Sequence, residues 1–138
     1  MMMVQQRPPR TLGPGHDTFW EWCGKDELRL PRCTACGEMA WPVPPACRHC
    51  GAADFVWEAL SGEATLVSWC GFVQDYYDGM MPVPFETIVV ELAGGPLFLS
   101  NPHGFVAADA PFGARLRVAF IDCEDRTGRF RLPVFERV

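Results

Sequence analysis

Two short cysteine motifs constrain this chain more strongly than any other feature. Cys33-Thr34-Ala35-Cys36-Gly37 is followed, after ten intervening residues, by Cys47-Arg48-His49-Cys50-Gly51. In each motif a tight turn can bring both sulfurs to one ion, and the glycine can take the positive φ that such a turn often needs. Four thiolates at this spacing suit one tetrahedral ion, so the sequence predicts a zinc site formed by Cys33, Cys36, Cys47 and Cys50.

A zinc ion with four protein ligands has no open coordination position, so we expect it to stabilise the fold and not to catalyse. The surplus negative charge of four thiolates can be partly offset by Arg29, Arg32 and Arg48 nearby. This explains the local basic bias without a nucleic acid. His49 lies inside the second motif, and we expect it to be a solvated turn residue.

Three alternatives to zinc fit the sequence less well. Disulfides would need an oxidising compartment, and the chain shows no secretory signal pattern. A redox C-x-x-C would be a single motif near a βαβ pattern, whereas this is a matched pair without one. Rubredoxin-type iron centres have similar cysteine motifs, but these lie much further apart in sequence. Structural zinc is therefore the favoured interpretation.

The composition predicts a small globular protein with a real core. Hydrophobic residues make up 49% of the 138, and the formal net charge of −5 argues mildly against a nucleic-acid binder. No apolar run reaches the length of a membrane span, and no apolar signal region opens the chain, so we expect a soluble, cytoplasmic protein. Cys23, Cys70 and Cys123 stand singly in apolar contexts and are interpreted as small core residues.

The chain before residue 61 divides into an arm and a metal-binding module. Residues 1–17 are rich in Pro and Gly and predict a flexible N-terminal arm that is ordered only on a partner. Residues 18–60 form the helix and zinc ribbon. Thr18 and Glu21 have the spacing of a capping box, which predicts a short helix ending near 24–26. Trp20 and Trp22 either pack on the ribbon or, for whichever is left outside, anchor another protein.

Alternating residues predict a strand over 27–32 before the first motif and another over 55–57 after the second. Pro42, Pro44 and Pro45 oppose regular pairing between them. Together these segments predict a rubredoxin-like zinc ribbon. It is too small to have a sufficient core of its own, and metal binding supplies about 10 kcal/mol in comparable modules.

Residues 61–138 predict a mainly β fold with five strands, over about 63–74, 85–93, 96–101, 114–123 and 129–136. Gly71 falls within the first strand, where a small barrel needs a bend or bulge, and Gly94-Gly95 indicates a tight hairpin. Residues 106–111 are long enough for one helical turn after the third strand. This pattern predicts a five-stranded OB-fold barrel, although a five-strand count also fits an SH3-like barrel.

An OB-fold barrel raises single-stranded nucleic acid as a ligand, which requires aromatic platforms in a basic groove. From residue 60 on there are six Arg and no Lys against ten acidic residues, a net charge of −4. Tyr76 and Tyr77 also stand beside Asp75 and Asp78. These charges argue against nucleic-acid binding, which is kept as the alternative function.

Few residues point to independent catalysis. His16 lies in the arm, His49 in a cysteine motif, and His103 in the loop after the third barrel strand. No nucleophile or carboxylate partner for His103 is visible in the sequence, so we expect a solvated loop histidine. No nucleotide-binding or hydrolase motif occurs. Catalysis by this chain alone is not expected.

The loop over residues 76–85 is the most unusual segment of the barrel. It gathers two Tyr, two Met and a Phe around turn-forming Gly and Pro. Such side chains suit an adaptable apolar surface for a protein or an acyl chain, and they suit equally a plug over the barrel's own mouth. The candidate contact residues are Trp20, Trp22, Tyr76, Tyr77, Met80, Met81 and Phe85.

From about Thr18 to its end, the chain resembles a bacterial and archaeal family of zinc-ribbon plus OB-fold proteins, formerly a domain of unknown function. The resemblance rests on the helix Phe19-Trp20-Glu21, the segment Leu-Arg-Leu-Pro-Arg-Cys-Thr-Ala-Cys-Gly at 28–37 and the Pro-rich crossing to Cys47 and Cys50. It continues in the barrel strand Val89-Val90-Glu91-Leu92 and in the closing Pro133-Val134-Phe135. The segment at 28–37 is the specific part, because barrel strands vary little between families.

The resemblance implies a function that the spacing alone does not show. Members of that family are small non-catalytic subunits or fused domains of acyl-CoA enzymes, including thiolases, thiolase-type aldolases and hot-dog-fold hydratases. It therefore predicts an accessory subunit that docks on a thiolase-like or hydratase subunit and helps to shape or stabilise its acyl-CoA site, with structural Zn2+ as cofactor and no membrane partner. A stand-alone acyl-CoA carrier is a third possibility.

Overall fold

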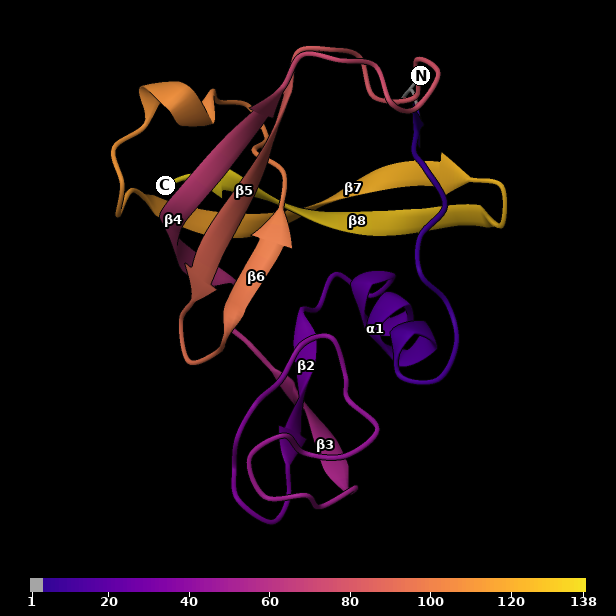
Figure 1. The fold of residues 1–138 in the computed structure, drawn as a ribbon, viewed down its shortest axis with the longest axis vertical. Coiled ribbons are helices and arrows are strands. Elements are labelled where there is room, and N and C mark those ends of the chain that lie inside the picture. The colour runs from indigo at the N-terminus through magenta and orange to yellow at the C-terminus, as the bar shows by residue number, and fades with distance from the viewer. Residues whose placement is uncertain (1–3) are drawn as a thin grey trace.

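A short helix, a two-stranded ribbon and a five-stranded barrel follow one another along the chain (Figure 1). The structure is a computed structural model that describes residues 4–138. No helix among these residues has both the length and the apolar character needed to cross a membrane. The elements are β1 (Gln5–Gln6), α1 (His16–Cys23), β2 (Arg29–Cys33), β3 (Phe55–Ala59), β4 (Glu63–Phe72), β5 (Phe85–Leu92), β6 (Leu97–Ser100), the 3-10 turn η1 (Ala107–Asp109), β7 (Arg115–Asp125) and β8 (Gly128–Arg137).

The barrel consists of β4 to β8. β4 pairs antiparallel with β5 and β7, β5 pairs with β6, and β7 pairs with β8. Beyond β6 the chain reaches β8 through a bridge between Pro102 and Phe135, and the Ser100 hydroxyl donates a hydrogen bond to the Pro133 carbonyl at 2.9 Å. With η1 after the third barrel strand, this order is that of an OB-type barrel. The prediction of a mainly β, zinc-ribbon plus OB-like fold is confirmed.

One hydrophobic cluster joins the helix, the ribbon and the barrel. Phe19 of α1 stacks on Trp41 with ring centroids 4.2 Å apart and also lies 6.2 Å from Phe98 of β6. Phe98 in turn contacts the fully buried Phe135 of β8. Because burial of apolar surface is the main stabilising term, the helix and the ribbon are held on the barrel by this shared core.

The N-terminal segment lies on the barrel, although the sequence predicts a flexible arm over residues 1–17. The first three residues of that arm fall outside the described part of the chain. β1 pairs parallel with the end of β7, at Gln5 with Cys123 and Gln6 with Glu124 (Figure 1). Further along, the Arg10 guanidinium lies 3.2 Å from the buried Asp125 carboxylate and covers the Phe130 ring at 4.4 Å. A composition rich in Pro and Gly does not reveal such contacts, because their partners lie more than a hundred residues away.

The helix begins at His16, two residues before the predicted capping box at Thr18. Its N-cap is Gly15, with φ of 83° and no side-chain cap. A Cβ at Gly15 would lie 2.0 Å from a Val43 methyl, so both the backbone conformation and the close approach require glycine. Asp17 joins the turn as well, because its carboxylate accepts a hydrogen bond from the Gly13 amide.

Two further expectations on β4 need correction. The bulge falls between Leu66 and Ser68, while Gly71 pairs regularly with Glu86. A Cβ on Gly71 would lie 3.7 Å from the Trp69 ring, which is an ordinary contact. Cys70 is exposed and not a core residue, whereas Cys23 and Cys123 are fully buried as predicted. The second half of β4 extends beyond the barrel core, so its alternation no longer marks burial.

Candidate metal centre and aromatic cleft

The four cysteines of the two motifs converge at the far end of the ribbon. All four sulfurs lie within 4.8 Å of one another, and the Cys33–Cys50 and Cys36–Cys47 pairs are 3.6 Å apart. A tetrahedron with Zn–S bonds of about 2.3 Å has edges of about 3.8 Å, whereas a disulfide needs about 2.05 Å. The residues fit zinc, and they form the structural zinc site of the ribbon.

Backbone amides favour the thiolate form of Cys33 and Cys47, whereas the pKa values of the neighbouring Cys36 and Cys50 thiols are raised. Gly37 and Gly51 have φ of 80° and 82°, and their amides donate to the carbonyls of Cys33 and Cys47. Hydrogen bonds from backbone N–H groups, that of Cys50 above all, lower the pKa of Cys47 to about 6, because they favour the thiolate. The amide of Cys36 acts in the same direction on the pKa of Cys33. Thiolates are the form that binds zinc.

A second candidate site lies where the helix, the ribbon and the barrel meet. This cavity, the aromatic cleft, has a volume of about 340 Å³. It is lined by residues of α1, β4, β5, β6, β8, the ribbon and the loop over 73–84, which joins β4 to β5 and includes most of the segment 76–85. Eight of its lining residues are aromatic: Phe19, Trp20, Trp41, Phe72, Tyr76, Tyr77, Phe85 and Phe98. Concave sites with mainly apolar walls and a few polar groups are the usual form of small-molecule sites.

The loop over 76–85 contributes both exposed and buried side chains to this region. Tyr76 is 63% exposed and Met80 is 44% exposed, whereas Met81 is only 8% exposed. Phe85 stacks on Phe72 with ring centroids 4.9 Å apart and Tyr77 lies beside it. The loop therefore combines a plug, through Met81, with an apolar outer surface.

The two candidate tryptophans have separate environments. Trp20 lines the aromatic cleft, and its indole N–H donates to the Thr11 carbonyl at 3.0 Å. Trp22 lies under the Arg29 guanidinium, 3.8 Å from the ring centroid, away from the cleft. Of the seven candidate contact residues, Trp20, Tyr76, Tyr77, Met81 and Phe85 line the cleft, and Trp22 and Met80 do not.

Sequence reasoning missed several residues that complete the cleft. Among them are Phe19 of α1, Trp41 of the ribbon and Arg7 after β1. On β6, Leu97 and Leu99 are 54% and 68% exposed, although an alternating strand normally turns polar residues to water. Their apolar alternation at 97 and 99 is the one signal that could have indicated an apolar surface beside the cleft.

His103, the remaining histidine candidate, lies apart from both sites. His103 is exposed, and its backbone amide donates to the Phe135 carbonyl. Near the metal, Arg29 pairs with Glu27 at 2.9 Å and Arg32 pairs with Glu58, so much of their charge is matched by carboxylates. Arg32 also donates to the Gly37 carbonyl.

Comparison with known proteins identifies the ribbon. Residues 20–56 match the family described as ChsH2, rubredoxin-like zinc ribbon domain. This part of the chain is therefore similar to that ribbon domain. The match includes all four zinc ligands, and the resemblance to zinc-ribbon plus OB-fold proteins is confirmed.

Two solved structures share the fold. One, described as "Ltp2-ChsH2(DUF35) aldolase", is 22% identical with a TM-score of 0.80, and the match covers 94% of this chain and 98% of that one. The other is a protein of unknown function from the DUF35 family of Sulfolobus solfataricus. It is 17% identical with a TM-score of 0.58, over 77% of this chain and 78% of that one. The fold of this chain therefore occurs in other proteins.

A curated protein of Thermomonospora curvata, described as a probable enoyl-CoA hydratase alpha subunit, is 26% identical over 143 residues. The match covers 96% of this chain but only 42% of that relative. This chain therefore corresponds to less than half of the length of that subunit.

Proposed function

We propose that this protein is a non-catalytic accessory subunit that docks on a thiolase-like or hot-dog hydratase partner and helps to form or stabilise its acyl-CoA site. The observation that carries the proposal is the superposition over nearly the whole chain on the structure described as the Ltp2-ChsH2(DUF35) aldolase, with a TM-score of 0.80. The similarity to a probable enoyl-CoA hydratase alpha subunit points to the same class of enzyme.

The surface around the aromatic cleft supports docking there. Tyr76, Tyr77 and Met80 are exposed on the loop, and Leu97 and Leu99 are exposed on β6. Large apolar side chains grouped on a surface are costly to leave in water and are typical of interaction sites. The cleft beside them is lined by eight aromatic residues. We assign the loop over 76–85 and the cleft mouth to the partner interface.

The zinc site is consistent with the same role, although it lies away from the cleft. Its four thiolates leave the metal no open position, so its contribution is to hold the ribbon and, through the shared core, Trp41 at the cleft. The chemistry would then belong to the partner, with this subunit supplying shape and burial at the acyl site.

Co-expression with thiolase-like and hydratase subunits from the same organism tests the proposal. We expect the two chains to co-elute in gel filtration at a fixed ratio and the partner's acyl-CoA turnover to be higher in the pair than in the partner alone. Separate elution together with full activity of the isolated partner would refute the accessory role.

A further inference from the structure

An arginine lies at the boundary of two cavities. Arg7 follows β1, and its backbone amide donates to the Glu124 carbonyl at 3.0 Å. Its half-buried side chain lines the aromatic cleft and also a neighbouring cavity of about 490 Å³ between the loop over 73–84 and the segment after β6. The two cavities share Phe72, Met81 and Phe85 as walls. A cation is thus held among apolar side chains.

The guanidinium of Arg7 has no carboxylate partner in the part of the chain that the structure describes. The ion pairs among residues 4–138 involve other arginines. Its hydrogen-bond acceptor is the Asn101 side-chain oxygen at 3.1 Å. The Asn101 amide nitrogen donates in turn to the Glu86 carbonyl at 2.8 Å, which fixes the orientation of that amide. A guanidinium offers five N–H donors, so most of them remain for another acceptor.

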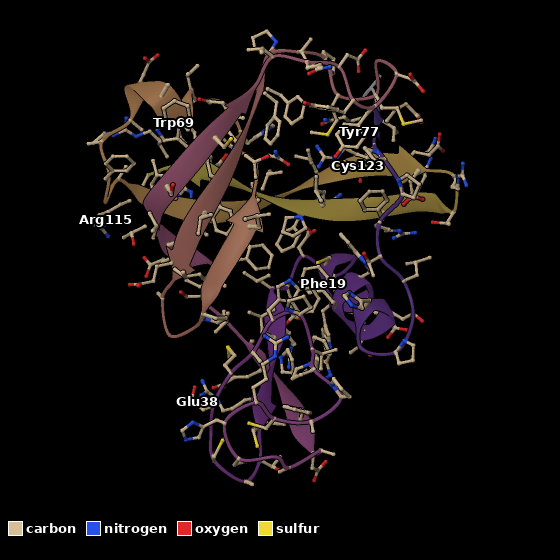
Figure 2. All side chains as sticks on the ribbon, viewed as in Figure 1. Phe19, Glu38, Trp69, Tyr77, Arg115 and Cys123 are labelled. Atoms are coloured by element: carbon tan, nitrogen blue, oxygen red, sulfur yellow. The ribbon has the colours of Figure 1, made fainter. Side chains whose placement is uncertain are left out.

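The electrostatics of Arg7 favour an added anion. Burial lowers the pKa of the Arg7 guanidinium, because removal from water disfavours its charged form. The groups that act on it most are the Cys123 thiol and the Tyr77 phenol, which lie beside the N-terminal strand in Figure 2, and neither is a carboxylate. A partly buried charge without a counter-charge is unfavourable, and an anion at hydrogen-bond distance would offset that cost.

The aromatic cleft is the cavity that suits such an anion. Of the described residues that line it, Arg7 is the only charged one. The neighbouring cavity also contains Glu86, whose negative charge opposes an anion even though its carboxylate accepts hydrogen bonds from the Ala107 and Ala108 amides. A volume of about 340 Å³ is at the low end of the roughly 300–1,000 Å³ of small-molecule sites, so the ligand is small.

We propose that the aromatic cleft binds a small apolar carboxylate, with its chain against Leu99 and the stacked rings of Phe72 and Phe85 and its two oxygens on the Arg7 guanidinium. The planar fork of an arginine matches the geometry of a carboxylate. Tyr77 also lines the cleft and carries a hydroxyl group. This site belongs to the isolated chain and does not depend on the partner enzyme, so the failure of one proposal leaves the other standing.

Titration of the purified full chain with octanoate tests the site, with tryptophan fluorescence as the readout, since Trp20 and Trp41 line the cleft. We expect saturable binding with a Kd of about 1 mM or tighter, given the affinity per atom of small ligands. Octanol, which has the chain without the charge, and acetate, which has the charge without the chain, should each bind at least about tenfold more weakly. Equal binding of octanol and octanoate would overturn the role of Arg7.

Two variants separate ligand binding from attachment of the arm. Arg7→Gln should weaken octanoate binding at least about tenfold. Asn101→Asp gives Arg7 a carboxylate partner but removes the hydrogen bond to the Glu86 carbonyl, so its melting temperature is measured in parallel; the arm should stay attached while octanoate binding falls by a similar factor. Amide hydrogen exchange at Gln5 and Gln6 reports on the arm. Unchanged octanoate affinity in Asn101→Asp, or no saturable binding by the unaltered chain, would contradict the proposal.

Discussion

The four zinc ligands differ in their exposure to water, and this difference decides which of them is suited to a substitution test. Cys33 and Cys47 are buried, whereas Cys36 and Cys50 are exposed at the tip of the ribbon. Replacement of an exposed ligand therefore removes a metal bond without creating a cavity in the core. Cys36 is the best position for a substitution that reports on the metal alone.

We predict about one zinc per chain in protein purified without added metal, and much less than one in Cys36→Ser. The variant should also melt at a lower temperature, because Leu28 and Leu30 before the first motif belong to the same core as the barrel. Metal analysis and thermal melting by circular dichroism measure both effects. Iron with a red colour, or folded protein without metal, would contradict the zinc assignment.

The buried Asp125 predicts a specific dependence of stability on pH. Burial by itself raises the pKa of Asp125, but hydrogen bonds from the Thr127 hydroxyl and from the Arg10 and Thr127 amides, with the Arg10 charge, outweigh it and lower the pKa. A carboxylate whose pKa is lowered on folding stabilises the protein above its unfolded-state pKa of about 3.9, and that stability is lost as the pH falls through the folded-state pKa.

Asp125→Asn should accordingly lower the melting temperature at pH 7 and reduce the loss of stability as the pH falls below about 4. Melting curves of both proteins across this range provide the measurement, with Asp109→Asn on the exposed η1 turn as the control. An unchanged acid profile in Asp125→Asn would show that this carboxylate does not hold the arm.

At the scale of elements, strands were more predictable than their connections. Each barrel strand was expected within about two residues of its position, because alternation of apolar residues reports directly on burial. The start of the helix was not predicted correctly. Gly15 packs against Val43, and this tertiary contact outweighs the local capping pattern at Thr18. The position of the arm depends on Arg10 and Asp125, which no local pattern connects.

The candidate site was predictable in part for the same reason. The loop over 76–85 was recognisable because Tyr, Met and Phe are unusual beside turn-forming residues. That Trp20 and Arg7 line the same cleft as this loop follows from packing of α1 and β1 on the barrel, which sequence spacing does not contain. The metal site was fully predictable, because its ligands lie within one short segment.

The loop contains its own control for stability. Met81→Ala should lower the free energy of unfolding by about 1–3 kcal/mol, because it truncates a buried side chain that contributes to both cavities. Met80→Ala, one residue earlier and exposed, should change it by less than about 0.5 kcal/mol. Chemical denaturation of the two variants measures the difference. Equal effects would mean that Met81 does not serve as a plug.

At the scale of the whole molecule, charge argues against nucleic acid. Of the six arginines after residue 60, Arg117, Arg129 and Arg131 are each paired with at least one carboxylate. We predict at most weak binding to single-stranded DNA or RNA near physiological salt, because few cations remain to release counterions. Fluorescence anisotropy over a range of salt concentrations measures it. A submicromolar, strongly salt-dependent complex would favour the alternative function.

The most direct test of the accessory role uses the double variant Tyr76→Ala and Met80→Ala. Calorimetry measures its affinity for the partner enzyme, and its own melting temperature is measured in parallel. Both side chains are exposed in the isolated chain, so their truncation should leave zinc content and melting unchanged. Phe112→Ala, which truncates a 72% exposed residue on the segment after η1, is the matched control.

If the loop is the docking surface, association of the double variant should weaken by about 2–4 kcal/mol, as for truncated anchors at interfaces, while Phe112→Ala binds normally. Unchanged affinity of the double variant, with a lowered melting temperature, would contradict the account and leave the loop as a cover of the barrel alone.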